Sequence, residues 1–262
     1  TYAMNPNSST SMENRNGILI KTPATNASPA VYENDFNGNS TYGENGDGQN
    51  IACNFLKWTD LLAYLDWSAL RPMTELEYEK ACRGFGPVVN DEYAWGNNNL
   101  TPTSSNSITN SGEGSEVSTT TLVPNHGMAS VAAATSNGPL RVGFAATSSP
   151  SRIYAGASYW GVLDLTGNVW EQTVSVGYSN GNQSAFTGVL GDGSLDGTGE
   201  ANQMGWSLNP VHSIVKGGSY ATPISSTNYG YYSAVANRYY ITVTTYNNNR
   251  HKQSGGRGVR QF

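Results

Sequence analysis

The side chains best suited to molecular recognition crowd into the last stretch of the chain, residues 216–262. Six tyrosines fall within residues 229–246 and five asparagines within residues 228–249, and the whole stretch contains no Asp or Glu. Tyrosine offers a large contact area with few rotatable bonds, and asparagine carries a donor and an acceptor on one short arm. This mixture is typical of a paratope, so we expect a ligand-contacting surface mounted on the preceding residues.

We expect the contacting side chains to form one exposed, mostly aromatic patch. Alternation along a predicted strand over residues 239–245 places Tyr240 and Tyr246 toward the ligand and turns Tyr239 inward. The alternative is that several of these tyrosines belong to the core. The predicted patch comprises Tyr229, Tyr231, Tyr232, Tyr239, Tyr240, Tyr246, Asn247, Asn248, Asn249 and His251.

Three closely spaced glutamates elsewhere, Glu75, Glu77 and Glu79, look like an acid/base set. Thr74 and Glu77 have the spacing of a capping box, in which each side chain satisfies an amide at the start of a helix. Capping therefore explains Glu77, and solvent exposure is expected to explain Glu75 and Glu79.

The two cysteines, Cys53 and Cys82, are too few for a disulfide framework. They form either one bridge or two buried thiols, and their helix-like, apolar surroundings favour buried thiols. The three histidines, His126, His212 and His251, show no metal-ligand spacing and are interpreted as unrelated surface or loop residues.

Two helices and several short strands must position the patch. One amphipathic helix is expected over residues 58–67 with Thr59 as its N-cap, and a second begins after Thr74 and ends at Gly84. Residues 1–50 are expected to be mostly irregular and packed along the surface. The pattern predicts an α+β fold in a single domain, 1–262. Strands are expected at 17–21, 30–32, 141–145, 169–174, 239–245 and 257–260, and leading to residue 216.

Charge is unevenly distributed along the chain. The net charge is −5, but the first 200 residues carry eight Lys/Arg against nineteen Asp/Glu, whereas the remainder carries six Lys/Arg and no acid. The basic residues are scattered rather than clustered, so we expect no nucleic-acid partner. No apolar stretch is long enough to span a membrane, and no signal peptide is visible.

Four motifs occur in the order found in one known family. They are LRPMTELEYE at 70–79, YAWGN at 93–97, GVLDLTGNVWE at 161–171, and KGGSY at 216–220 with GRGVR at 256–260. Together they resemble the formylglycine-generating enzyme/sulfatase-modifying domain over about residues 50–262. The resemblance implies that family's variant of the C-type lectin fold, with few helices, short antiparallel strands and long loops.

The departures from the family pattern bear on activity. The oxidase of this family binds copper through a cysteine pair before the closing motif, and residues 239–256 contain no cysteine. Thiolates are soft ligands that Tyr or Asn cannot replace. The iron-dependent sulfoxide synthases of the family use clustered histidines, which are also missing. We therefore expect a protein that is not an enzyme and needs no cofactor, with an oxidase or related metalloenzyme as the alternative.

The remaining resemblance is to the variable proteins of diversity-generating retroelements. These keep the fold without the catalytic residues and vary side chains between the GGS motif and the closing motif, here residues 216–262. Mutagenesis at adenines converts Asn codons into Tyr, Ser, Asp and His codons, and the Tyr/Asn crowding is what that process would leave. The resemblance implies a protein or glycan receptor on a target cell as partner, without membrane insertion. It also implies an extracellular, virion-associated or cell-surface location, as an adhesin or tail fibre. A fixed-specificity lectin is a third interpretation.

The turn over residues 164–171 has a second role in the enzyme family. There it binds structural calcium through side chains matching Asp164 and Glu171 and carbonyls matching Gly167 and Val169. Oxygen ligands of this kind are what calcium requires. The alternative is a tight turn in which Asp164 and Glu171 bond backbone amides. Arg257 and Arg260 are expected to anchor the terminus rather than touch a ligand.

Overall fold

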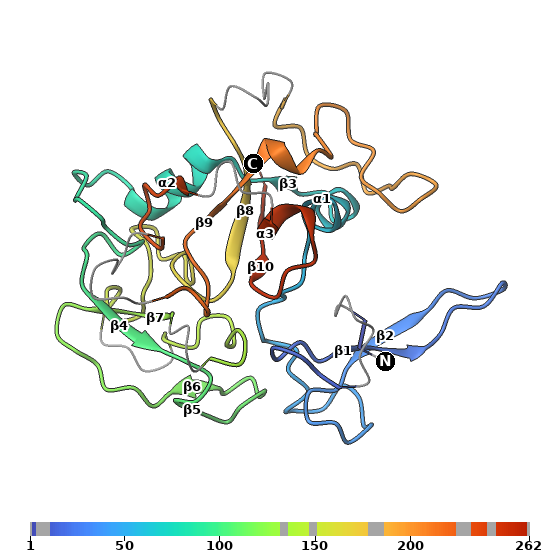
Figure 1. The fold of residues 1–262 in the computed structure, drawn as a ribbon, viewed down its shortest axis with the longest axis horizontal. Helices are drawn as coiled ribbons and strands as arrows, with labels where there is room; N and C mark the ends of the chain where they lie inside the picture. Colours follow the sequence, from blue (N-terminus) through green and yellow to red (C-terminus); the bar gives the residue numbers. More distant parts are fainter. Residues whose placement is uncertain are drawn as a thin grey trace.

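The computed structural model of the 262-residue chain describes residues 2–3, 11–131, 136–146, 151–177, 186–223, 232–239 and 245–260. Short strands, few helices and long connections make up this part, so the α+β prediction is confirmed (Figure 1). The helices are α1 (Trp58–Trp67), α2 (Glu75–Arg83), α3 (Thr245–Asn248) and the 3-10 turn η2 (Pro210–His212). The strands are β1 (Ile18–Thr22), β2 (Val31–Asn34), β3 (Arg71–Pro72), β4 (Leu100–Thr103), β5 (Ile108–Thr109), β6 (Val117–Ser118), β7 (Gly127–Ser130), β8 (Trp170–Val174), β9 (Ser213–Lys216), β10 (Ser254–Gly255) and β11 (Gly258–Val259).

A three-stranded sheet of order β10-β8-β9 lies at the centre of the molecule (Figure 1). β8 pairs antiparallel with β9 and parallel with β10, and every residue of β8 and β9 is buried. Because both faces of β8 are buried, its side chains do not alternate between core and solvent, and the polar Glu171, Gln172 and Thr173 are buried with the rest. The sheet therefore ties both the start of the C-terminal stretch, which follows β9, and its residues 254–255 to the core.

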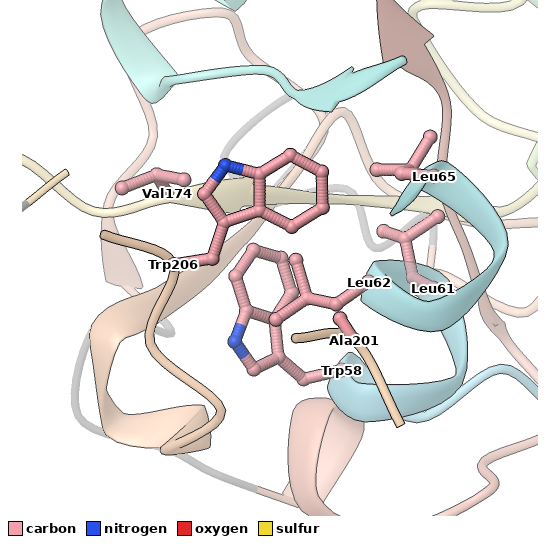
Figure 2. Close-up of a cluster of buried hydrophobic side chains, with 7 residues drawn as sticks. All are labelled: Trp58, Leu61, Leu62, Leu65, Val174, Ala201 and Trp206. Carbon is pink, nitrogen blue, oxygen red and sulfur yellow. The ribbon is translucent and has the colours of Figure 1, made fainter. Parts of the chain in front are cut away.

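α1 buries one face against the loop that precedes β9 (Figure 2). The buried cluster comprises Trp58, Leu61, Leu62, Leu65, Val174, Ala201 and Trp206. The indole nitrogens stay satisfied, because Trp58 Nε1 donates to the Ser207 carbonyl at 2.8 Å and Trp206 Nε1 donates to the Val189 carbonyl at 3.1 Å. A buried indole needs such a partner.

The bounds predicted for α1 are confirmed, but its predicted cap is wrong. The N-cap is Lys57, not Thr59, and the Asp60 carboxylate accepts from the Lys57 amide at 3.2 Å. Asp60 thus satisfies an amide of the helix start from inside the first turn, the role of the acid in a capping box. Sequence preference favoured Thr59 because threonine is a common N-cap and lysine is not.

α2 forms as its local sequence predicts. The Thr74 hydroxyl accepts from the Glu77 amide at 3.2 Å, and the Glu77 carboxylate accepts from the Thr74 amide at 2.9 Å. Gly84 ends the helix with φ 63°. The buried side of α2 includes Tyr78 and Cys82, which belong to the core cluster that also contains Leu165 and Val235.

Residues 11–50 of the N-terminal segment contact residues from the middle and from near the end of the chain. The two strands predicted at 17–21 and 30–32 form as β1 and β2, and they pair antiparallel in a hairpin that projects from the body (Figure 1). Arg15 is buried against Glu116, and Asn54 Nδ2 donates to the Asn14 carbonyl at 3.1 Å and to the Lys252 carbonyl at 2.9 Å. The segment was expected along the surface, yet these residues pack inside.

One predicted strand, over residues 141–145, is not found, and a second, over residues 239–245, lies largely outside the described residues. Residues 141–146 form turns, with Arg141 making only an isolated bridge to Ile51. Thr245, the end of the predicted strand 239–245, begins α3, and Tyr239 is not in a strand. The β-branched residues that motivated the second prediction lie at 241–244, outside the described residues. Within the described part of the chain, no helix combines the length and hydrophobicity needed to cross a bilayer.

Candidate functional site

The C-terminal stretch leaves the central sheet through a glycine turn after β9. Gly217 and Gly218 have φ of 84° and 78°, a region that L side chains rarely adopt. A Cβ on Gly218 would lie 2.1 Å from the Ser233 hydroxyl oxygen, so the return segment 232–239 packs directly on this turn. The close approach explains why two glycines stand at this point.

Tyr220 belongs to the core rather than to a ligand surface. It is 1 % exposed, and its hydroxyl donates to Asn14 Oδ1 at 3.0 Å and to the Lys252 carbonyl at 3.2 Å. Burial raises its pKa well above the usual range, so the phenol stays protonated and keeps both bonds. Tyr220 was not among the predicted contact residues, and its burial shows that the C-terminal stretch also contributes to the core.

Arg238 fixes the segment 232–239 to α2 through a buried carboxylate. Its Nε and Nη2 each lie 2.8 Å from an oxygen of Glu75, and Nη2 also donates to the Val176 carbonyl at 2.8 Å. Glu75 is 2 % exposed, so its predicted exposure is wrong. It also accepts from the Val176 amide at 2.5 Å. The carboxylate is retained inside because bidentate pairing compensates its charge.

Tyr239 follows this anchor and is 52 % exposed. The prediction that it turns inward is therefore wrong, since it required residue 239 to belong to a strand, and residue 239 does not. Its ring packs edge-on against the half-buried Tyr232, with centroids 5.3 Å apart and planes at 77°. The Tyr239 amide donates to Asn237 Oδ1 at 3.0 Å. The structure thus brings two predicted contact residues together, one of them in solvent.

Arg250, which follows α3, fixes this later part of the C-terminal stretch to α1. Its Nε and Nη2 lie 2.8 and 3.0 Å from the two carboxylate oxygens of Asp60, and this pairing raises the arginine pKa. Immediately before it, Asn248 and Asn249 are exposed, as predicted. Asn247 is 1 % exposed and donates to the Ser213 carbonyl at 3.1 Å, so its predicted place on the surface is wrong. It attaches α3 to β9 instead.

Several of the remaining predicted contacts lie outside the part of the chain that the structure describes. Tyr229, Tyr231 and Tyr240 lie outside the described residues, as does the side chain of Tyr246, whose backbone belongs to α3. Among the described residues of the predicted contact set, Tyr239, Asn248 and Asn249 are exposed, and their union in one patch stays a prediction.

His251 is half-buried and serves the backbone. Its ring Nδ1 accepts from the Gln253 amide at 3.3 Å, and its carbonyl accepts from the amides of Phe55 at 3.2 Å and Ser254 at 3.0 Å. Desolvation, and then the charge of Lys252, lower the pKa of His251 below its ordinary value. A neutral imidazole is also what an accepting Nδ1 requires.

We expect this depressed pKa to make the fold sensitive to mild acid. The unfolded chain binds the proton first as the pH falls through about 6.5, so the stability contribution is complete above that pH and declines below it. The urea midpoint should therefore drop between pH about 7.5 and about 5.5 by more in the wild type than in His251→Asn. An equal drop in both proteins would show that His251 is not responsible.

The C-terminal cations explain the uneven charge of the chain. Four of the six pair with acids of the first 200 residues: Lys216 with Glu79, Arg238 with Glu75, Arg250 with Asp60 and Arg257 with Glu171. Sequence reasoning missed Arg238 and Arg250 as anchors. The available signal was the opposite net charge of residues 1–200 and residues 201–262. That signal indicates ion pairs between the two parts of the chain, but not which residues form them.

The turn over residues 164–171 borders a cavity of about 240 Å³ that Asp164, Glu171, Arg257 and Cys53 help to line. Arg257 Nε donates to Glu171 Oε1 at 2.7 Å, and Arg257 Nη2 reaches the carbonyls of Leu163 and Asp164 at 3.3 and 3.4 Å. The predicted anchoring role of Arg257 is confirmed. Arg260 is exposed, and its predicted anchoring role stays a prediction.

The two carboxylates of this cavity suit a hard cation. Glu171 is 3 % exposed, and its Oε2 has no hydrogen-bond partner within the described part of the chain. Asp164 accepts from the Gly143 amide at 2.6 Å, yet burial still raises its pKa. A buried acceptor without a donor is costly, and a bound cation would remove that cost. No group of three His, Cys, Asp or Glu side chains arranged for a metal occurs among the described residues. Calcium here would therefore need backbone carbonyls, as expected for Gly167 and Val169.

The two cysteines are free and lie in different places. Cys82 is buried on α2 as predicted, whereas Cys53 is exposed in an irregular segment, so its predicted burial in a helix is wrong. Each lines a different cavity. Desolvation raises the thiol pKa of the buried Cys82 to about 12, so this thiol is protonated at neutral pH.

This fold, with its glycine turn after β9, its closing strand β11 and its arginine-anchored C-terminal stretch, agrees with one family of proteins. The family model of the sulfatase-modifying factor enzyme 1-like domain matches residues 34–261, and the chain belongs to this family. No curated protein matches the chain in a sequence search.

Proposed function

We propose that the chain is a non-enzymatic binding protein whose Tyr/Asn-rich C-terminal stretch is a diversified ligand-contacting surface, of the kind made by diversity-generating retroelements. One observation carries the proposal. Tyr239, Asn248 and Asn249 are exposed, while Arg238 and Arg250 beside them are bonded bidentately to Glu75 and Asp60. Exposed contact residues next to fixed anchors combine variability with low ordering cost on binding.

The proposed partner is a protein or glycan receptor on the surface of a target cell. Tyr and Asn together suit either class, because the phenol supplies apolar area with a polar tip and the amide adapts its hydrogen bonds. A protein that serves in this way acts outside the cell that makes it, so we propose a location on a virion, such as a tail tip, or on a cell surface.

The test is to sequence the gene and its flanking DNA in many isolates. We expect substitutions to concentrate at codons 220–251 and to spare the anchor codons Arg238 and Arg250. A near-identical template with Asn codons should lie beside a reverse transcriptase gene. Uniform codons and no template would show that the tyrosines are fixed, and the proposal would fail.

The competing function is an oxidase of the kind that gives the family its name. A copper-binding oxidase needs paired thiolates, but Cys53 and Cys82 line different cavities, and burial raises the pKa of the Cys82 thiol. A copper titration of the purified, reduced protein separates the two functions. Binding of Cu(I) that is lost in both Cys53→Ser and Cys82→Ser would favour the oxidase.

We also propose that Asp164 and Glu171 hold a structural calcium ion. Glu171 Oε2, which has no hydrogen-bond partner among the described residues, and the half-buried Asp164 supply two oxygen ligands at one cavity, and oxygen ligands are what calcium selects. The ion would brace the turn that leads into β8 and would take no part in chemistry.

Calcium is therefore expected to raise the melting temperature relative to a chelator such as EGTA. A ligand present at 100 times its dissociation constant stabilises the native state by about 2.7 kcal/mol. Asp164→Asn should abolish the increase, whereas Asp192→Asn, in an exposed acidic loop, should preserve it. Equal melting curves in calcium and EGTA would contradict the site. Scanning calorimetry of the three proteins makes this measurement.

A further inference from the structure

A second group of exposed aromatic side chains lies at the C-terminal end of α2, away from the Tyr/Asn-rich stretch in sequence. Phe85, Tyr159 and Trp160 are 74 %, 46 % and 51 % exposed. Their rings nevertheless contact one another, with centroids 6.1 Å apart for Phe85–Tyr159, 5.3 Å for Phe85–Trp160 and 4.9 Å for Tyr159–Trp160. Three adjoining aromatic rings in solvent are costly and point to a binding surface.

The rings are held in place by the backbone of α2. Trp160 Nε1 donates to the Lys80 carbonyl at 3.1 Å, and the Tyr159 amide donates to the Cys82 carbonyl at 3.0 Å. The Lys80 ammonium lies 4.5 Å from the centroid of the Phe85 ring. A rigid aromatic surface loses little conformational freedom when a ligand binds, so it is already organised for contact.

Tyr159 is also one wall of a cavity of about 240 Å³. Polar side chains line the same cavity, among them Glu92 and Arg152. Glu92 is 3 % exposed and pairs with Arg83, whose Nε lies 2.6 Å from Glu92 Oε1. Arg152 is exposed, and its Nη1 donates to the carbonyls of Trp95 at 3.2 Å and Ala157 at 3.0 Å. The cavity thus offers a carboxylate acceptor and a fixed guanidinium donor beside a ring.

From this arrangement we propose that the Phe85–Tyr159–Trp160 surface and its cavity form a saccharide-binding site. A sugar ring has an apolar face of C–H groups that can lie on aromatic rings. Its hydroxyl groups both donate and accept, and Glu92 and Arg152 supply the complementary acceptor and donor. Small-ligand sites combine an apolar wall with a few placed polar groups in this way.

The saccharide site is independent of the proposed diversified surface. It shares no residue with the predicted contact set, and its residues lie before residue 161, outside the stretch proposed to vary. It would therefore give the protein a fixed specificity for a glycan in addition to a variable one for a receptor.

The test is a glycan array probed with the labelled protein, followed by titration calorimetry with the free form of the best-bound oligosaccharide. We expect Phe85→Ala and Trp160→Ala each to weaken binding at least tenfold. Trp67→Ala removes an exposed tryptophan of α1 and should leave binding unchanged, as should Tyr239→Ala. Thermal unfolding confirms that each variant is folded, which is expected because all four side chains are exposed.

Two outcomes would overturn the proposal. If the wild-type protein bound no glycan on the array, the aromatic surface would serve another purpose. Loss of glycan binding in Tyr239→Ala but not in Trp160→Ala would assign the sugar to the Tyr/Asn-rich stretch. A result against this site leaves the codon survey unaffected, and uniform codons leave the glycan titration unaffected, so the two proposals fail separately.

Discussion

Replacing Arg15 with alanine is expected to lower the free energy of unfolding by about 3–5 kcal/mol, because the change leaves a buried carboxylate without its counter-charge. Arg15 and Glu116 are 7 % and 0 % exposed, and Arg15 Nη1 also donates to the Pro139 carbonyl at 2.6 Å. Glu116 further accepts from the amides of Gly112 at 2.9 Å and Arg141 at 2.7 Å. The measurement is urea unfolding of both proteins followed by tryptophan fluorescence.

Lys21→Ala is the matched control, since it also removes a cation of the N-terminal segment. Lys21 and Glu33 pair at 3.4 Å with side chains 41 % and 35 % exposed, and such surface pairs contribute only about 0–1 kcal/mol. Equal unfolding midpoints for Arg15→Ala and wild type would show that Glu116 finds another partner. The Arg15–Glu116 pair links the matched domain to the segment before it, because Arg15 lies upstream of residue 34, where the family match starts.

Trp58→Ala should cost about 3–5 kcal/mol of stability, the range for removing a buried aromatic side chain. Trp58 is 2 % exposed in the cluster that joins α1 to Val174 of β8 and to Trp206 (Figure 2). The change removes packing and also leaves the Ser207 carbonyl without its donor. Differential scanning calorimetry gives the size of the loss.

Trp67→Ala tests the same residue type at the other end of the same helix. Trp67 is 63 % exposed, and substitutions at exposed positions usually change stability by no more than about 0.5 kcal/mol. Similar losses in both variants would mean that α1 is held by its propensity and not by its buried face. Because α1 carries Asp60, a weakened α1 should also loosen the anchor of Arg250.

Local signals accounted for the elements that the sequence predicted well. The Thr74/Glu77 capping box and Gly84 set the ends of α2 through contacts within a few residues, so a reader of the sequence can find them. Residues 58–67 form α1 because their apolar spacing matches a helix. The family motifs placed the central strands and the closing Arg257 in the correct fold.

The errors arose where partners are distant in sequence. Glu75 was expected in solvent because no nearby residue reveals Arg238, which lies 163 positions later. Tyr239 was expected inside because a period-two argument requires a strand, and tertiary contacts place the residue beside Tyr232 instead. Asn247 looks like a surface residue by type, yet β9 offers its amide a buried carbonyl. Side-chain type alone does not show which groups another segment will cover.

The anchors at Arg238 and Arg250 also decide how the protein would carry a mechanical load. If a ligand pulled on the exposed Tyr239, Asn248 or Asn249, tension would reach α2 through Glu75 and α1 through Asp60, so two charged contacts would bear the force in parallel. Asp60 and Glu75 lie near the first turns of their helices, and each helix packs on a buried cluster. Tension would therefore be delivered to the hydrophobic core instead of peeling the segment from one end.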